Sequence, residues 1–139
     1  MPLTLTLTEG ILPTGDEKKA FVQLAETMMR LHGLSDNPFM TKNVVGSIHL
    51  LPQEYTFGGM NERAVAFVEW KVPSFAFADR EVQKAYVREA ADLLHELSGK
   101  TLPKDQIWVN VTHAVDGIWG IDGHAFTNAE LMESISRSQ

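Results

Sequence analysis

The residue of this sequence best suited to do chemistry is Pro2. It follows Met1 and opens an alternating run of leucine and threonine from Leu3 to Thr8, so a strand is expected at the very start of the chain. Methionine is normally cleaved before a small residue such as proline, which predicts a free secondary amine at Pro2. A chain α-amino group has a pKa of about 8, and burial lowers it. Such an amine can remove a carbon-bound proton beside a carbonyl group.

Other common catalytic chemistries have little support in the sequence. The chain has no cysteine, which excludes disulfides, thiolate zinc sites and a thiol nucleophile. His49 and His113 are 64 positions apart and invite a metal site, but no carboxylate-rich motif accompanies them. No glycine-rich phosphate loop or Ser-His-Asp motif is present. We therefore expect neither a metal nor a cofactor.

Composition limits the class of protein. The 139 residues are 44% hydrophobic and 22% charged, which fits one globular domain over residues 1–139. The formal charge of −6 argues against binding to nucleic acid or to an anionic membrane surface. No stretch approaches the roughly 18 apolar residues of a membrane span, and the N-terminus does not resemble a signal peptide. A cytoplasmic location is the expectation.

An internal repeat organises the chain. Residues 19–25 (KAFVQLA) are similar to residues 84–90 (KAYVREA) at an offset of 65. Each of these helical segments lies between two runs with the alternation of a strand. The four predicted strands are residues 3–8, 44–51, 64–72 and 107–115. The order is βαβ followed by βαβ, with repeats over about 2–60 and 61–126 and a short C-terminal tail that forms a capped helix from Thr127.

The boundaries of the two long helices can also be predicted. Thr14 to Glu17 has the pattern of a capping box, Gly33 suits a left-handed end, and a helix over about 15–32 follows. The second helix is expected between Asp79 and Gly99. Their apolar faces are expected to carry Phe21, Leu24, Ala25, Met28 and Leu31 in the first helix, and Val82, Tyr86, Leu93 and Leu97 in the second.

Two βαβ units predict an α+β fold with a four-stranded sheet and two helices on one face. The other face would carry polar and β-branched residues such as Thr4, Thr6, Asn110 and Thr112. This composition favours packing between the sheets of several subunits, for which a closed ring is one solution. A monomeric ferredoxin-like sheet remains open as the alternative.

At this point the sequence resembles the tautomerase superfamily, whose members use an amino-terminal proline. The opening segment of its 4-oxalocrotonate tautomerase branch is similar to residues 2–10 and 16–19 of this chain. The closing hairpin of that branch is similar to residues 111–123. Residues 51–59 and 107–111 are similar to segments of its macrophage migration inhibitory factor branch. The tandem length also matches the cis-3-chloroacrylic acid dehalogenase branch. The resemblance implies a homotrimer with three sheets lining a barrel, and three pockets with Pro2 at the base.

The resemblance also suggests residues that would bind the substrate. Trp108 and Asn110 stand where the migration-inhibitory-factor branch has pocket residues, and Asn110 could donate to a forming enolate. Tyr55 and Trp119 fall in hairpins where an aromatic side chain would keep water out. Lys42 lies near the position of a pocket lysine. Each of these residues also has a purely structural interpretation. Asn110 could serve strand pairing or a turn, Tyr55 and Trp119 could pack in the core or the trimer interface, and Lys42 could be a solvated surface lysine.

Several family positions differ in this chain. Two arginines hold a dicarboxylate in the 4-oxalocrotonate branch. In this chain Ile11 stands at the first of these positions, and Trp108 or Val44 at the second. Three positions that hold carboxylate and water in the dehalogenase branch correspond to Met29, Pro73 and Ala76. Asp116 could be the acidic residue that activates water in that branch, but its place in a Val-Asp-Gly turn explains it equally well. These differences favour an aromatic or weakly charged substrate. Lys71 and Arg80 are the other basic residues that could supply a cation.

Three functions follow as hypotheses. The first is a cofactor-independent keto–enol tautomerase, an isomerase that acts through Pro2 on a small carbonyl compound such as a phenylpyruvate-like or unsaturated keto acid. The second is Pro2-assisted hydration or dehalogenation of a 3-haloacrylate-like substrate. The third is a non-catalytic trimeric binding protein, which requires that Met1 is retained, because the nitrogen of Pro2 is then an amide.

Overall fold

A four-stranded mixed sheet is the centre of the fold. The computed structural model describes all 139 residues, and its main strands are β1 (Pro2–Thr8), β2 (Val45–Leu51), β5 (Ala66–Pro73) and β6 (Ile107–Ala114). They are ordered β2-β1-β5-β6. The pairs β1–β2 and β5–β6 are parallel, whereas β1 and β5 pair antiparallel in the middle. The predicted α+β fold with two βαβ units is confirmed.

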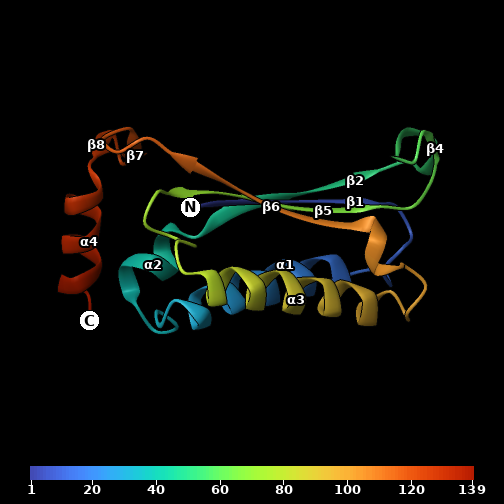
Figure 1. The fold of residues 1–139 in the computed structure, drawn as a ribbon, viewed down its shortest axis with the longest axis horizontal. Helices are drawn as coiled ribbons and strands as arrows, with labels where there is room; N and C mark the ends of the chain where they lie inside the picture. Colours follow the sequence, from blue (N-terminus) through green and yellow to red (C-terminus); the bar gives the residue numbers. More distant parts are fainter.

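Two long helices cover one face of this sheet. They are α1 (Asp16–Leu31) and α3 (Arg80–Leu97), and Figure 1 shows both on the same side with no helix packed on the other. β1 explains the difference between the faces, because Leu3, Leu5 and Leu7 are buried toward the helices and alternate with half-buried threonines. Asn110 and Thr112 on β6 are exposed. The predicted polar, uncovered face is confirmed.

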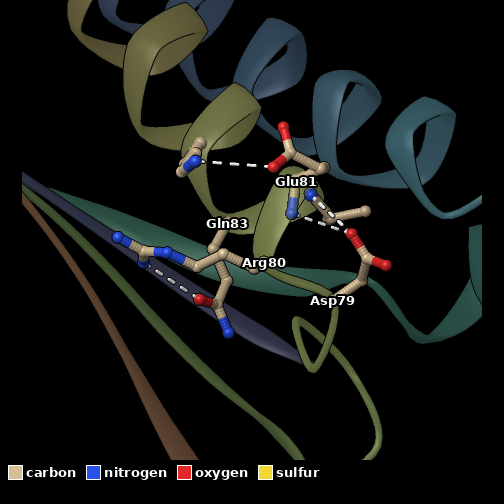
Figure 2. Close-up of polar contacts among 6 residues, drawn as sticks. Asp79, Arg80, Glu81 and Gln83 are labelled. Carbon is tan, nitrogen blue, oxygen red and sulfur yellow. Dashed lines mark hydrogen bonds and ion pairs between the residues drawn. The ribbon is translucent and has the colours of Figure 1, made fainter.

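The helix starts differ from one another. Asp79 caps α3 as expected, and its carboxylate accepts from the backbone N–H groups of Glu81 at 2.8 Å and Val82 at 3.1 Å, as Figure 2 shows. The prediction of a capping box that begins at Thr14 is wrong for α1. Gly15 is the N-cap with φ of +93°, a conformation that glycine adopts without strain, and its N–H donates to the carboxylate of Glu17.

The buried faces of the helices follow the predicted periodicity with one change. Met28 and Leu24 of α1 are buried, as is Tyr86 of α3. The deepest line of α3 continues through Ala90 and Leu94 at a spacing of four, while Leu93 and Leu97 flank it and are half-buried. The reason is that α3 contacts both the sheet and α1, so its apolar stripe is wider than the one line that the pattern suggested.

Short elements close the two ends of the sheet. At one end lie the 3₁₀ turns η1 (Gln53–Tyr55) and η2 (Lys104–Gln106) and the hairpin β3 (Phe57–Gly58) with β4 (Asn61–Glu62). At the other end lie α2 (Pro38–Asn43), the hairpin β7 (Trp119–Ile121) with β8 (His124–Phe126), and α4 (Asn128–Arg137), as Figure 1 shows. Thr127 caps α4 through the N–H of Glu130, so the expected C-terminal helix is confirmed.

A buried chain of hydrogen bonds ties the sheet to both helices. The indole Nε1 of Trp70 on β5 donates to the hydroxyl of Tyr86 at 2.7 Å. That hydroxyl donates to the carbonyl of Leu24 in α1 at 3.1 Å. Burial raises the pKa of Tyr86, so the phenol remains a donor. Three elements therefore share one polar contact within the apolar core.

We predict that Tyr86→Phe destabilises the fold by about 1–3 kcal/mol, because it leaves the buried indole N–H of Trp70 without an acceptor. Urea unfolding followed by tryptophan fluorescence measures the change. Val87→Ala, at an exposed position of the same helix, is the matched control and should shift the midpoint little. Equal stability of Tyr86→Phe and the parent protein would contradict the role given to this chain of bonds.

Candidate active site

A cavity of about 430 Å³ lies at the start of β1, at the end of the sheet where Figure 1 places the N-terminus and the β7–β8 hairpin. Its lining comes from four separate parts of the chain: the N-terminus, the α2–β2 junction, the central strand β5, and the segment from β6 to β7. The lining residues are Met1, Pro2, Asn43, Val45, Lys71, Thr112, His113, Ala114, Ile118, Trp119, Gly120 and Ile121. Half of these twelve are hydrophobic.

Strand register sets the chemistry of the cavity floor. Pro2 pairs with Val45 on one side. On the other side Leu3 pairs with Trp70, so the next step of the antiparallel ladder sets Pro2 opposite Lys71, which itself pairs with Thr112. Paired residues point to the same face of a sheet. Four neighbouring side chains therefore form a row across the open face, one from each strand, in the order Val45, Pro2, Lys71 and Thr112.

Lys71 is the basic side chain among the lining residues. It is exposed and forms no ion pair within the chain. Sequence analysis named it only as one of two further candidates, since its importance depends on which strand lies beside β1. The other, Arg80, starts α3 and hydrogen-bonds Gln83 at 3.2 Å (Figure 2), and it does not line the cavity.

The β7–β8 hairpin supplies the apolar wall. Trp119 lines the cavity together with Ile118 and Ile121, so the structure brings this predicted residue next to Pro2. The indole Nε1 of Trp119 is buried and has no hydrogen-bond partner. Asp116 anchors the hairpin, because its carboxylate accepts from the N–H of Asn128 at 2.7 Å at the start of α4.

The other predicted binding residues do not lie beside Pro2 within the chain. Asn110 pairs with Glu69 one row along the open face, and Trp108 pairs with Phe67 two rows along. Each row adds about 7 Å. Trp108 is 56% exposed and Tyr55 is 67% exposed. Tyr55 follows the far end of β2, at the opposite end of the sheet from Pro2.

Lys42 lies in the last turn of α2 and is exposed, but it does not line the cavity; its neighbour Asn43 does. The resemblance pointed to the α2–β2 junction only through Lys42, and no residue pattern in the sequence singles out Asn43. The pairing of β1 with β2 brings this junction to the N-terminus.

The two histidines with a repeat relationship lie apart. His49 is on edge strand β2 and faces the open side with Thr6, its pairing partner. His113 is on the opposite edge strand β6 and pairs with the buried Val72, and one of its ring nitrogens contacts the carbonyl of Ala76 at 2.7 Å. The structure contains no group of three or more potential metal-ligating His, Cys, Asp or Glu residues.

Met1 occupies a well-defined position in front of Pro2. Its side chain is 5% exposed, its amino group donates to the carbonyl of Asn43, and its carbonyl accepts from the N–H of Val45 at 3.3 Å. Burial lowers the pKa of this amino group to about 6. The cavity end of β1 is therefore a place where an amine loses its proton near neutral pH.

Comparison with known proteins assigns the fold through structure alone. No family profile matches the sequence, and no curated protein matches it. Among solved structures, the macrophage migration inhibitory factor homologue from Prochlorococcus marinus has a TM-score of 0.69 and 17% identity, covering 91% of this chain and 99% of its own. A fused 4-OT described as a symmetric trimer has a TM-score of 0.72 and 13% identity, with 94% and 98% covered.

A third similar structure is Pt0534, described as inactivated by 2-oxo-3-pentynoate. Its TM-score is 0.72 at 15% identity, covering 94% of this chain and 98% of its own. The sheet with two βαβ units and the matches over nearly whole chains show that this chain has the same fold as these three structures. The predicted resemblance is thereby confirmed for the fold. No helix of the chain is both long and apolar enough to cross a membrane.

We predict that the amino group of Met1, in protein that retains this residue, titrates with a midpoint near 6 in the folded state. This pKa is lower than the ordinary value of 8.0 for a chain amino group, so between these pH values the unfolded chain binds more protons than the folded chain. The folded state is therefore most stable, with respect to this group, above pH 8. It loses that stability as the pH falls through 6, because the buried amine takes up its proton less readily than the amine of the unfolded chain. An NMR titration of the Met1 α-carbon measures the midpoint, and a value near 8 would contradict the burial of the amine.

Proposed function

We propose that this chain is a cofactor-independent keto–enol tautomerase in which Pro2, once Met1 has been removed, is the general base. The observation that carries the proposal is the row on the cavity floor that sets Pro2 opposite Lys71. The side chain of His113, the other titratable lining residue, is engaged with the carbonyl of Ala76. The amine of Pro2 is thus the group best placed to accept a proton.

The surroundings favour a neutral amine at Pro2. Burial lowers the pKa of the amine that now precedes it in the chain. The amine of Pro2 would lie at the same end of β1, beside the apolar Ile118 and Ile121, and Lys71 adds a positive charge. Desolvation and a nearby cation both disfavour the protonated form of an amine. A base with a pKa close to the working pH is the efficient one.

The reaction would proceed by two proton transfers. The lone pair of the Pro2 nitrogen takes a proton from the carbon beside the carbonyl, and the electrons of that C–H bond move to the carbonyl oxygen. The ammonium of Lys71 stabilises the negative charge of the resulting enolate. Pro2 then passes this proton to the enolate oxygen, which completes the enol and restores the neutral amine. Ketonisation runs the two transfers in reverse, from oxygen to Pro2 and from Pro2 to carbon.

Substrate choice follows from the single cation and the apolar wall. One ammonium group can bind one carboxylate or enolate, whereas a dicarboxylate would need a second positive charge that the lining residues do not provide. The apolar side chains of Trp119, Ile118 and Ile121 disfavour a second charged group on the substrate. We therefore propose a phenylpyruvate-like keto acid as the substrate class.

We also propose that the chain acts as a homotrimer, with the open face packed against neighbouring sheets. The exposed residues Val45 and Leu51 on edge strand β2 give that face an apolar border, and one similar fold is described as a symmetric trimer. In such an assembly Tyr55, Trp108 and Asn110 would bind substrate in the pocket of a neighbour.

A non-catalytic binding protein is the alternative that one observation favours. Met1 is held by its side chain and by two backbone hydrogen bonds, so a chain that retains it is well packed. Its Pro2 nitrogen would be an amide without useful basicity. The intact mass of the purified protein separates the two, because the tautomerase must lack one methionine.

We predict that Pro2→Ala, which replaces the ring-held secondary amine by a primary amine, lowers kcat/KM for phenylenolpyruvate ketonisation roughly 100-fold, the low end of what a positioned general base contributes. Ultraviolet absorbance follows the loss of the enol. Pro13→Ala, at an exposed loop position, is the matched control and should keep the parent rate. Equal rates for Pro2→Ala and Pro13→Ala in protein free of Met1 would remove Pro2 from the mechanism.

Loss of the cation should be equally visible. We predict that Lys71→Gln lowers kcat/KM for the same substrate about 10- to 100-fold, because a hydrogen bond to a charged group contributes about 1.5–3 kcal/mol. Lys71→Arg should restore part of the rate. Lys19→Gln, which removes an exposed lysine from α1, controls for the change in net charge. An unchanged rate in Lys71→Gln would assign the binding of the oxyanion to another group.

A further inference from the structure

A second cavity of about 270 Å³ lies on the helix side of the sheet, behind Met1. Eight of its ten lining residues are hydrophobic. Four of the six methionines in the chain line it, namely Met1, Met28, Met40 and Met132, together with Phe75 and Ile135. No part of the proposed mechanism uses this space.

The ring of His32, the one titratable side chain in the lining of this cavity, is already occupied. The Nδ1 atom of His32 contacts the carbonyl of Met28 at 2.8 Å, and its Nε2 atom accepts from the N–H of Phe77 at 3.0 Å. Both ring nitrogens are thus used within the protein. Apart from the hydroxyl of Ser136, the lining therefore offers no free polar side chain, and such a largely apolar cavity suits an apolar guest.

Met1 is the residue that the two cavities share. Its side chain points to the helix side, as the alternation of β1 requires of the residue two before Leu3, and is 5% exposed. Removal of Met1 therefore deletes the side chain between the cavities. The amine of Pro2 would then face an apolar chamber as well as the open site that holds Lys71.

We propose that this chamber binds the aryl group of the substrate once Met1 is gone. The inference rests on the proposed function and adds where the substituent sits. An apolar cavity of about 150 Å³ admits benzene, so the larger chamber has room for a phenyl ring. Methionine sulfur makes favourable contacts with aromatic rings and its flexible chain adapts to their shape. The substrate would extend from its enolisable carbonyl group at Lys71, past Pro2, to a ring seated between α1, α2 and α4.

The test compares two acetylenic keto acids that label an amine. In 2-oxo-3-pentynoate and in its phenyl analogue 2-oxo-4-phenyl-3-butynoate, the Pro2 nitrogen adds to the alkyne carbon distal to the ketone. The amine proton moves to the neighbouring carbon and no group leaves. Intact mass measures the rate of each adduct in protein free of Met1, and the readout does not depend on turnover.

Ser136→Phe places a large side chain at the cavity lining from α4, and Ala129→Phe makes the same change at an exposed α4 position that does not line it. We expect Ser136→Phe to slow labelling by the phenyl probe at least about 10-fold, the effect of crowding an apolar pocket, with the methyl probe within about 2-fold of the parent. Ala129→Phe should change neither rate.

Other outcomes have distinct meanings. Equal slowing of both probes, or no slowing of the phenyl probe, would overturn the aryl chamber while leaving Pro2 as the reactive amine. Failure of both probes to label the parent protein would instead overturn the proposed function. Should Ser136→Phe fail to fold, Met132→Trp fills the same cavity from a side chain that is 47% exposed, and the same two rates decide.

Discussion

The antiparallel pairing of β1 with β5 is the constraint on which the rest of the structure depends. It joins the two βαβ units at the centre of the sheet and sets Leu3 against Trp70 in the core. The same register sets Pro2 opposite Lys71 on the open face. A shift by one residue would send the leucines of β1 to the open face and Pro2 toward the helices, so core and site would be lost together.

The two faces of the sheet have separate tasks. The helix face holds the apolar core and the hydrogen-bonded chain of Trp70, Tyr86 and Leu24, which gives the strands a rigid support. The open face carries the polar row of the cavity floor. The hairpin that closes the site is tied to α4 by Asp116, so the apolar wall is positioned by the end of the chain as well as by the sheet.

Met1 connects stability with chemistry. While present it fills the space between two cavities, and its amine and carbonyl hydrogen-bond at the α2–β2 junction. Its removal would leave a less completely filled core but would create a basic amine at a desolvated position. A site formed at the expense of packing is consistent with the general tension between an active centre and a stable one.

Local patterns in the sequence determined much of this protein. The period of two in residues 3–8 and the repeat at 19–25 and 84–90 depend only on neighbours along the chain. They predicted the four main strands, the two long helices and the open polar face correctly, but not α2. The same analysis singled out Pro2 and Trp119. It placed the cap of α1 at Thr14, one residue early, because the choice between Thr14 and Gly15 depends on backbone torsion.

Tertiary structure decided which residues accompany Pro2. Lys71 and Asn43 are 69 and 41 residues away along the chain, and only the pairing of β1 with its two neighbours brings them to the cavity. The hairpins illustrate the same point, since β7–β8 closes the Pro2 end of the sheet while Tyr55 lies at the other. Side-chain alternation is a local property, whereas strand order and register arise from the packing of the whole chain.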